Sequence, residues 1–294
     1  MVESKWKSWW EKVTPLPLFQ LPEAPRYRLQ RAPLVQAIAQ VRYPIIARLE
    51  SLSGIAPLQD ALREDFPYME QEMAQEVSLV VGPAGPAAGA SEASITWKLT
   101  NDSGTQIVVG AGSASLSAGA SYTTVEAFAA DFERMLNALI SVGVPRCDRL
   151  GVRYLSVAED LPGEDRSWRR WFKPELLGWA GSEIIADGVL ETSINQVMLR
   201  QPPTGDLSGP PADIQATVRH GAVPGQTQVP SIPPLHIAVP SYLIDLDVYS
   251  VGHQRFQPAS ILEQFELFHQ QIDRFFFWSL TDEGAKHFGM VNDT

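Results

Sequence analysis

Two segments of the chain carry apolar residues at every third or fourth position, over 124–142 and again over 259–278. Thr123 and Glu126 match a capping box at the start of the first segment, and Gly143 follows its end. An apolar stripe of this period is typical of a helix that packs one face against a core. We therefore predict two long amphipathic helices. Their apolar faces comprise Val125, Phe128, Phe132, Met135, Leu136 and Leu139 in the first, and Ile261, Phe265, Phe268, Ile272 and Phe275 in the second.

Strands are predicted between these helices, because hydrophobic and polar residues alternate over several short segments. One lies at 33–44, in which Val35, Ala37, Ala39 and Val41 alternate with Gln36, Ile38 and Gln40 until Pro44 ends the segment. Helical spacing predicts a short helix at 58–66 and an aromatic, basic helix at 165–179. Further strands are predicted at 70–81, 94–99, 105–116, 149–157, 184–199, 213–220 and 237–249.

The order of these elements repeats: each half of the chain has a strand, a helix, three strands and a long amphipathic helix. This order predicts an α+β fold of two layers, in which duplicated β-α-β-β-β-α units form one curved, mostly antiparallel sheet of about eight strands. Both long helices then cover one face, and the opposite face is concave or open. At the level of fold, this arrangement is similar to the TATA-binding-protein and helix-grip architectures. The expected divisions are a proline-rich N-terminal arm at 1–33, a first half at 34–145, a second half at 146–289 and a tail at 290–294.

Three short motifs lie at the start, middle and end of the two predicted halves, which together span about 34–289. They are PLVQAIAQVRYP at 33–44, RLGVRYLSV at 149–157 and FWSLTDEGAKHFG at 277–289. They resemble motifs of a sporadically distributed, functionally uncharacterised family of bacterial and archaeal proteins, with a P-x-V-E-A-x-x-x-x-R-F opening, an R-x-G-L-R-Y-x-N strand and a final S-x-T-D-E. The chain differs from these patterns at Gln36, where Glu is typical, and at Ser156, where Asn is typical. The resemblance supports the predicted fold and implies no catalytic residue.

The charge of the chain narrows the range of partners. Its 34 acidic and 23 basic residues give a net charge of -11 at pH 7. This balance disfavours a duplex nucleic-acid binder, which normally presents a basic surface.

The single cysteine, Cys147, excludes an internal disulfide and favours a cytoplasmic protein. No membrane span is expected, because the chain has no run of about 18 apolar residues.

The candidate ligand-binding residues are two acids and two arginines on predicted strands. Asp245 and Asp247 alternate with aliphatic residues, so both side chains lie on one sheet face about 7 Å apart. Arg149 and Arg153 share a face of the strand at 149–157. If these strands are neighbours, the four residues form a charged, self-neutralising surface suited to a polar ligand. The same alternation is also typical of a strand with one solvated face.

Two aromatic segments are candidate partner-binding surfaces. Trp6, Trp9 and Trp10 form an apolar stripe in the arm, which either packs on its own domain or docks on a partner. Arg169 and Arg170 alternate with aromatic residues, as in grooves that bind single-stranded nucleic acid, and as on the flanks of an amphipathic core helix.

No motif in the sequence indicates an enzyme. The histidines are scattered singly, without the spacing of a zinc site, and we expect neither a metal nor another cofactor. The sequence therefore favours a non-enzymatic binding or adaptor protein that acts through a protein partner, with oligomerisation left open. An enzyme or sensor that binds a small polar ligand on the open sheet face is the alternative, and a single-stranded nucleic-acid binder is a weaker one.

Overall fold

A computed structural model describes the chain over residues 18–19, 21, 23–24, 27–75, 79–82, 85–88, 93–164, 166–182, 190–201 and 213–292. Trp6, Trp9 and Trp10 of the arm lie outside these residues. Most of the fold described below belongs to one large sheet and the helices that cover it.

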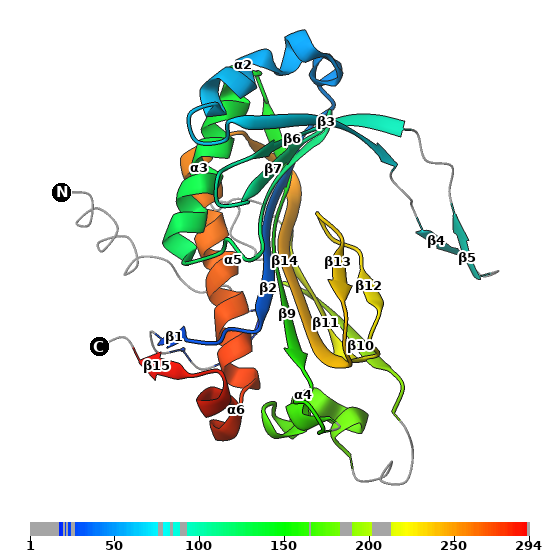
Figure 1. Cartoon of the computed structure of the whole chain (residues 1–294). Coiled ribbons are helices and arrows are strands. Elements are labelled where there is room, and N and C mark those ends of the chain that lie inside the picture. The colour runs from blue at the N-terminus through cyan, green and yellow to red at the C-terminus, as the bar shows by residue number, and fades with distance from the viewer. Residues whose placement is uncertain are drawn as a thin grey trace.

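Nine strands form the main sheet, and every neighbouring pair is antiparallel. They are β2 (Leu34–Arg42), β3 (Tyr68–Gln75), β6 (Ala93–Thr100), β7 (Gln106–Val109), β8 (Ser113–Ala118), β9 (Arg146–Glu159), β10 (Ser193–Arg200), β11 (Asp213–Val223) and β14 (Ser241–Arg255). Their order across the sheet is β10-β11-β14-β9-β2-β8-β7-β6-β3. The sheet is curved, with its helices on one side (Figure 1).

Three two-stranded sheets accompany the main sheet. They pair β1 (Tyr27–Leu29) with β15 (Met290–Asn292), β4 (Leu79–Gly82) with β5 (Gly85–Ala88), and β12 (Thr227–Val229) with β13 (Leu235–Ile237). The first pair joins residues of the predicted arm to residues of the predicted tail. The third pair is a hairpin that lies on the side of the sheet away from the helices (Figure 1).

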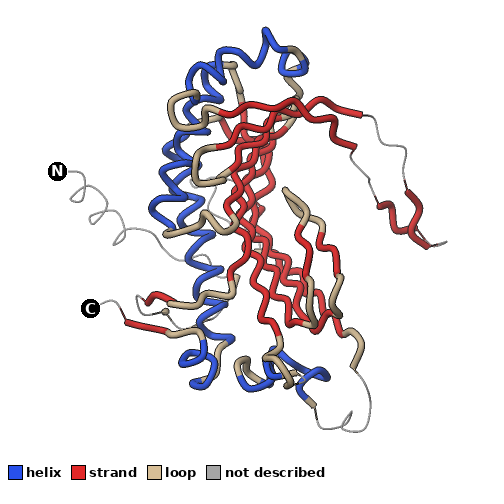
Figure 2. The backbone as a smooth tube through the Cα atoms, in the orientation of Figure 1, coloured by secondary structure: helices blue, strands red, loops and turns tan. Residues whose placement is uncertain are grey.

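The helices form the second layer, separate from the strands (Figure 2). They are α2 (Leu52–Leu62), α3 (Val125–Ser141), α4 (Pro174–Leu177), α5 (Pro258–Ser279) and α6 (Asp282–His287). The hydroxyl of Thr124, one residue after the predicted cap, accepts a hydrogen bond from the Ala127 N–H at 3.2 Å and caps α3. No helix in the described part of the chain has the length and apolar composition needed to cross a membrane.

The long helices α3 and α5 lie side by side and share one core, as the apolar stripes predict. The ring of Phe265 lies 6.1 Å from that of Phe128 and 5.3 Å from that of Phe132. All three side chains are buried, and each contributes roughly 1.5–3 kcal/mol through the apolar surface that it removes from water. The two halves of the chain are therefore packed as one body, in which neither helix stripe faces solvent.

The sheet order shows a pseudo-twofold relation between the halves. Strands β2 and β9 pair at the centre, β8 and β14 lie beside them, and β7 and β11 follow. The strands β6 and β10 are next, and β3 lies beyond β6. Among the described residues, no strand occupies the corresponding place beyond β10. The predicted duplicated α+β fold is thus confirmed, with one strand more in the first half than the repeat predicts.

Several predicted elements differ from the structure. The helix expected at 58–66 begins earlier, as α2, and the strand expected at 237–249 is divided between β13 and β14. The strand expected at 105–116 is two strands, β7 and β8, because Gly110 and Gly112 make a tight turn closed by a 2.8 Å bond from the Gly110 N–H to the Ser113 carbonyl. The helix expected at 165–179 is two 3₁₀ turns on either side of the short α4. Pro174 lacks a backbone N–H, and Gly178 has a positive φ of 51°, so a continuous helix cannot form there.

Candidate functional site

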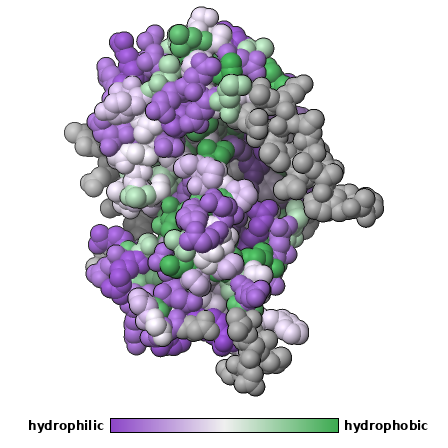
Figure 3. Space-filling view, turned by 45° about the vertical axis from the view of Figure 1, so that its right-hand side comes forward, coloured by the Kyte–Doolittle hydropathy of each residue, from purple (hydrophilic) through white to green (hydrophobic). Residues whose placement is uncertain are grey.

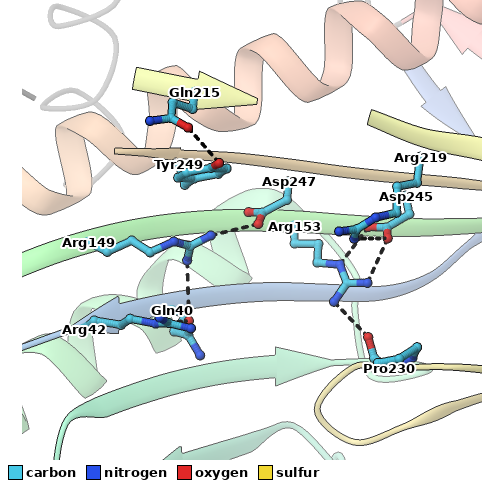
Figure 4. A network of polar contacts seen from close by, with 10 residues as sticks. All are labelled: Gln40, Arg42, Arg149, Arg153, Gln215, Arg219, Pro230, Asp245, Asp247 and Tyr249. Carbon is cyan, nitrogen blue, oxygen red and sulfur yellow. Dashed lines mark hydrogen bonds and ion pairs between the residues drawn. The ribbon is translucent and has the colours of Figure 1, made fainter. Parts of the chain in front are cut away.

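The concave face of the main sheet carries the four polar residues that the alternation predicts. Side chains alternate along a strand, so Arg149 and Arg153 of β9 point to the face away from the helices. Strand β14 pairs with β9 and places Asp245 and Asp247 on the same face. The structure brings all four side chains into one polar network (Figure 4).

Asp245 is the centre of one half of this network. Its carboxylate accepts two hydrogen bonds from the guanidinium of Arg153, at 2.7 and 2.8 Å, and one from Arg219 of β11 at 3.4 Å. The side chain of Asp245 is only 2% exposed. It is therefore not on a solvated strand face, and its charge is balanced by two arginines. A bidentate arginine–carboxylate ion pair of this kind is among the stronger polar interactions in proteins.

Asp247 and Arg149 form the other half. The guanidinium of Arg149 donates to Asp247 at 2.8 Å and to the Gln40 side-chain oxygen at 3.4 Å. It also lies 4.5 Å from the centre of the Tyr249 ring, which fits a cation–π contact. Burial raises the pKa of Asp247, and the nearby Arg149 and Arg153 counteract that rise. Arg149 is thus held flat against the sheet by three neighbours.

A glycine makes this position of Arg149 possible. Gly151 follows on the same face of β9, and a Cβ atom at Gly151 would lie 2.2 Å from a terminal nitrogen of Arg149. Any other residue would have to displace the guanidinium. Because Tyr249 lies opposite Gly151 in the β9–β14 register, the missing side chain opens the space into which Arg149 folds.

The β12–β13 hairpin covers part of the concave face, which corrects the expectation of a fully open surface. An apolar cluster lies beneath it, with Ile38 and Leu155 from the central strands and Val229 and Ile237 from the hairpin. The Pro230 carbonyl accepts a 3.0 Å hydrogen bond from Arg153. The hairpin is thus fixed to the arginine network by a polar contact and to the sheet by apolar packing.

Two arginines lie exposed next to the network on this face. Arg42 lies opposite Arg149 and is exposed, and Arg219 has a side chain that is 44% exposed. Within the network, Arg149, Arg153 and Arg219 contact two aspartates, and Arg42 contacts Gln40. The other carboxylates on this face have cations of their own: Asp213 pairs with Arg200, and Glu70 and Glu72 pair with Lys98. Hydrophilic residues cover most of this side of the molecule, and its surface is hollowed near the middle (Figure 3). Because both aspartates are held by arginines, this arrangement suits the binding of an anion better than acid–base catalysis.

A second polar cluster, which sequence reasoning missed, lies on the helix side of the sheet. The hydroxyl of Tyr154 lies 3.2 Å from that of Tyr122 and 3.1 Å from Nδ1 of His269. Burial lowers the pKa of His269, while Asp273 and Glu126 counteract that change. A neutral His269 with its proton on Nε2 accepts from Tyr154 at Nδ1, and Tyr154 then accepts from Tyr122.

Glu266 and Asp273 supply the two carboxyl groups of this cluster, and the pKa of each is raised. Burial, followed by repulsion from Glu126, raises the pKa of Glu266 to about 7. Its Oε2 atom is buried without a hydrogen-bond partner among the described residues. Burial also raises the pKa of Asp273, which accepts a 2.9 Å hydrogen bond from Tyr27. The spacing of Glu266, His269 and Asp273 along one face of α5 is the sequence signal for the cluster. The tyrosines come from distant segments and leave no such signal.

The predicted partner-binding arginines are engaged within the chain. Arg169 donates to the carbonyls of Ala180 and Ser182, at 2.8 and 2.7 Å. Arg170 forms ion pairs with Glu164 and Glu283, at 2.5 and 3.4 Å, and its side chain is half exposed. The aromatic residues on either side of this pair belong to the core and do not form a stacking surface for bases; they are Trp168, Trp171 and Phe172.

A comparison of the chain with models of protein families found no match, and a comparison with curated proteins found none. Within the described residues, no three His, Cys, Asp or Glu side chains are grouped so as to hold a metal ion.

Proposed function

We propose that the chain is a non-enzymatic binding protein, and that the uncovered part of its concave face holds an acidic segment of a protein partner. The observation that carries the proposal is the local excess of arginine in the network, where three guanidinium groups share two carboxylates and a fourth, that of Arg42, contacts Gln40. The remaining N–H groups of these arginines are available to a third and fourth carboxylate. The side chains of Arg42 and Arg219 are exposed, so carboxylates of a partner would contact these two arginines first.

Carboxylates of a protein partner match the geometry of these guanidinium groups. A guanidinium presents parallel N–H groups that match the two oxygens of a carboxylate, as Arg153 already does with Asp245. The net charge of -11 opposes the approach of a nucleic-acid duplex, whereas a short acidic segment needs only the local cationic surface. Such a segment would lie on the concave face of the sheet, with one side against the β12–β13 hairpin.

The hydrogen bonds of Asp245 and Asp247 also favour a binding role over catalysis. A general acid or base must exchange its proton with a substrate, but Asp245 is enclosed and already accepts three hydrogen bonds. Asp247 is held by Arg149. The alternative function, binding of a small polar ligand by an enzyme or sensor, would use the same guanidinium groups. The experiment below therefore includes a small anion as a separate arm.

The test is fluorescence anisotropy with a labelled glutamate-rich peptide, compared with a glutamine-rich peptide of the same length. We expect the acidic peptide alone to bind, and its affinity to fall with added salt. The substitutions Arg42→Gln and Arg219→Gln should each weaken binding about two- to fivefold, the usual contribution of an exposed ion pair. Arg63→Gln, an exposed arginine at the end of α2, is the matched control and should have no effect.

Three results would decide against the proposal. Equal binding of the two peptides would show that charge does not direct recognition. Unchanged affinity in the Arg42 and Arg219 variants would place the peptide elsewhere. Competition by acetate or inorganic phosphate at low concentration, without saturable binding of the peptide, would favour the small-ligand function.

A further inference from the structure

The strand β10 forms one edge of the main sheet (Figure 1), and its outer side pairs with no strand among the residues that the structure describes. In the first half of the chain, β3 lies beyond β6, whereas no described strand takes the corresponding place beyond β10. An edge of eight residues is about 26 Å long and presents a row of backbone N–H and C=O groups. The pseudo-twofold relation therefore marks β10 as the edge at which the sheet lacks a strand.

The β10–β11 register shows which backbone groups face outward. Just beyond β10, in continuation of that register, the Gln201 N–H donates to the Ile214 carbonyl at 2.8 Å. Hydrogen-bonded pairs alternate along an antiparallel ladder, so the odd-numbered residues of β10 bond to β11. The even-numbered residues, which include Ile194, Gln196 and Met198, therefore direct their N–H and C=O groups to the free edge.

The side chains of this edge are uncharged and largely apolar. The first seven residues of β10 are SINQVML, without a charge, a proline or a glycine. Ile194 and Met198 are 51% and 63% exposed. Both lie on the concave face with Gln196, which accepts a 2.8 Å hydrogen bond from Arg219. Sheet edges normally carry charges, prolines or bulges that prevent pairing, so an edge without them is suited to pairing with another strand.

The opposite edge of the sheet differs in this respect. Strand β3 carries Glu70 and Glu72, which are exposed and form ion pairs with Lys98 of β6. A second copy of the chain placed against β3 would bring these carboxylates close to their own counterparts, and like charges on adjacent strands are unfavourable. Of the two edges, β10 is therefore the one that suits a second copy.

The sequence of β10 is complementary to itself in an antiparallel arrangement. A twofold axis that keeps both concave faces on one side pairs even-numbered residues with even-numbered ones, so the outward-facing backbone groups of the two copies meet. With the axis at Gln196, Ile194 lies opposite Met198 of the second copy, and both exposed apolar side chains gain a neighbour. Moving the axis by one residue in either direction places Ile194 opposite Gln196 or Arg200 instead. The axis at Gln196 is therefore the favoured one.

We propose that β10 is a dimerisation edge, at which a second copy of the chain pairs antiparallel around Gln196 and continues the sheet. Main-chain hydrogen bonds and the apolar pairs of Ile194 with Met198 stabilise this interface. Its size is at the lower end for specific interfaces, so we expect association in the micromolar range. Assembly stops at two copies, because the dimer covers both β10 edges. The dimer is independent of the proposed binding of an acidic segment, because the arginines of each concave face stay uncovered.

The first test is sedimentation velocity of the full chain from about 1 to 100 µM. We expect a monomer–dimer equilibrium that added salt strengthens, because salt screens the repulsion between two chains with a net charge of -11 each. Binding of the acidic peptide should weaken with salt, so the two proposals can fail separately. Met198→Lys should weaken the dimer at least about tenfold. Met73→Lys, the same change at an exposed position of the β3 edge, is the control and should leave the dimer unchanged.

The second test is residue-resolved amide hydrogen exchange on the unmodified chain, which needs no variant to fold. The N–H groups of Gln196 and Met198 should exchange rapidly in dilute protein and become protected as the concentration rises. The N–H of Val197, which bonds to β11, should be protected at every concentration. Protection of Gln196 that is independent of concentration would show that another part of the same chain covers the edge, and would overturn the proposal. A chain that stays monomeric at about 100 µM, or a dimer that Met198→Lys does not weaken, would also overturn it.

Discussion

Replacing Glu266 with glutamine should stabilise the protein at neutral and alkaline pH and have little effect in acid. The carboxyl of Glu266 is half-buried in the helix layer, faces Glu126, and has one oxygen without a partner among the described residues. These conditions favour its neutral form. Glutamine has nearly the same shape as the protonated acid and cannot ionise, so Glu266→Gln isolates the effect of the charge.

The magnitude follows from the pKa of Glu266, which is raised from 4.5 to about 7. A folded state that binds the proton more tightly than the unfolded state loses stability as the pH rises from about 4.5 through about 7. At about 1.4 kcal/mol for each tenfold change in proton affinity, the full effect is about 3 kcal/mol. Partial access of water reduces it, and we expect Glu266→Gln to gain about 1–3 kcal/mol at pH 8.

The assay is urea denaturation of both proteins over a series from pH 4.5 to pH 8, followed by circular dichroism. The difference in the free energy of unfolding between variant and unmodified chain should be smallest at pH 4.5, grow up to about pH 7 and then stay constant. Taking the difference cancels the titration of His269 and the other groups. Glu263→Gln, an exposed residue of the same helix, is the control. A difference that is independent of pH, or a variant less stable at pH 8, would refute the reasoning.

Three other predictions follow from the packing and charge. Phe132→Ala and Phe265→Ala should each cost about 3–5 kcal/mol in urea denaturation, and Glu133→Ala on the exposed side of α3 less than about 0.5; small losses at both phenylalanines would contradict a shared core. Gly151→Ala should cost about 1–3 kcal/mol, because its Cβ displaces the guanidinium of Arg149, and most of this cost should vanish in an Arg149→Ala background; an equal cost in both backgrounds would argue against the contact. Binding to duplex DNA should be undetectable by gel shift at physiological salt, given the net charge of -11, and sub-micromolar affinity at about 150 mM salt would contradict this.

The sequence predicts those parts of the fold in which a local period determines what is buried. The stripe from Phe128 to Leu139 gives α3 to within a few residues, and the alternation around Asp245 gives the phase of β14. That phase, together with the phase of Arg149 and Arg153, is enough to put four charged residues on one face. The pairing that makes them neighbours depends on the order of strands, which the repeat of elements suggests but does not determine.

The features that sequence reasoning missed depend on contacts between distant segments. Tyr154 lies beside His269 only because α5 crosses the helix face of β9, and no spacing along the chain contains that information. The hairpin at 227–237 covers Ile38 and Leu155 although its own strands have only three residues each. In the segment at 165–179, the tertiary fold buries Trp168, Trp171 and Phe172 without a continuous helix, so their helical spacing is misleading.

The pairing of β2 with β9 at the centre of the sheet has a consequence for biosynthesis. Ala39 lies opposite Val152, so one of the two innermost strands leaves the ribosome long before its neighbour. Until β9 is made, β2 is an uncovered strand edge and the apolar face of α3 lacks α5, and both are features that promote aggregation. A chain that stops at residue 145 should therefore be insoluble on expression, and a monomeric, cooperatively folding fragment would contradict this. Protection of the nascent chain is then needed until α5 has been translated, because that helix covers the apolar face of α3.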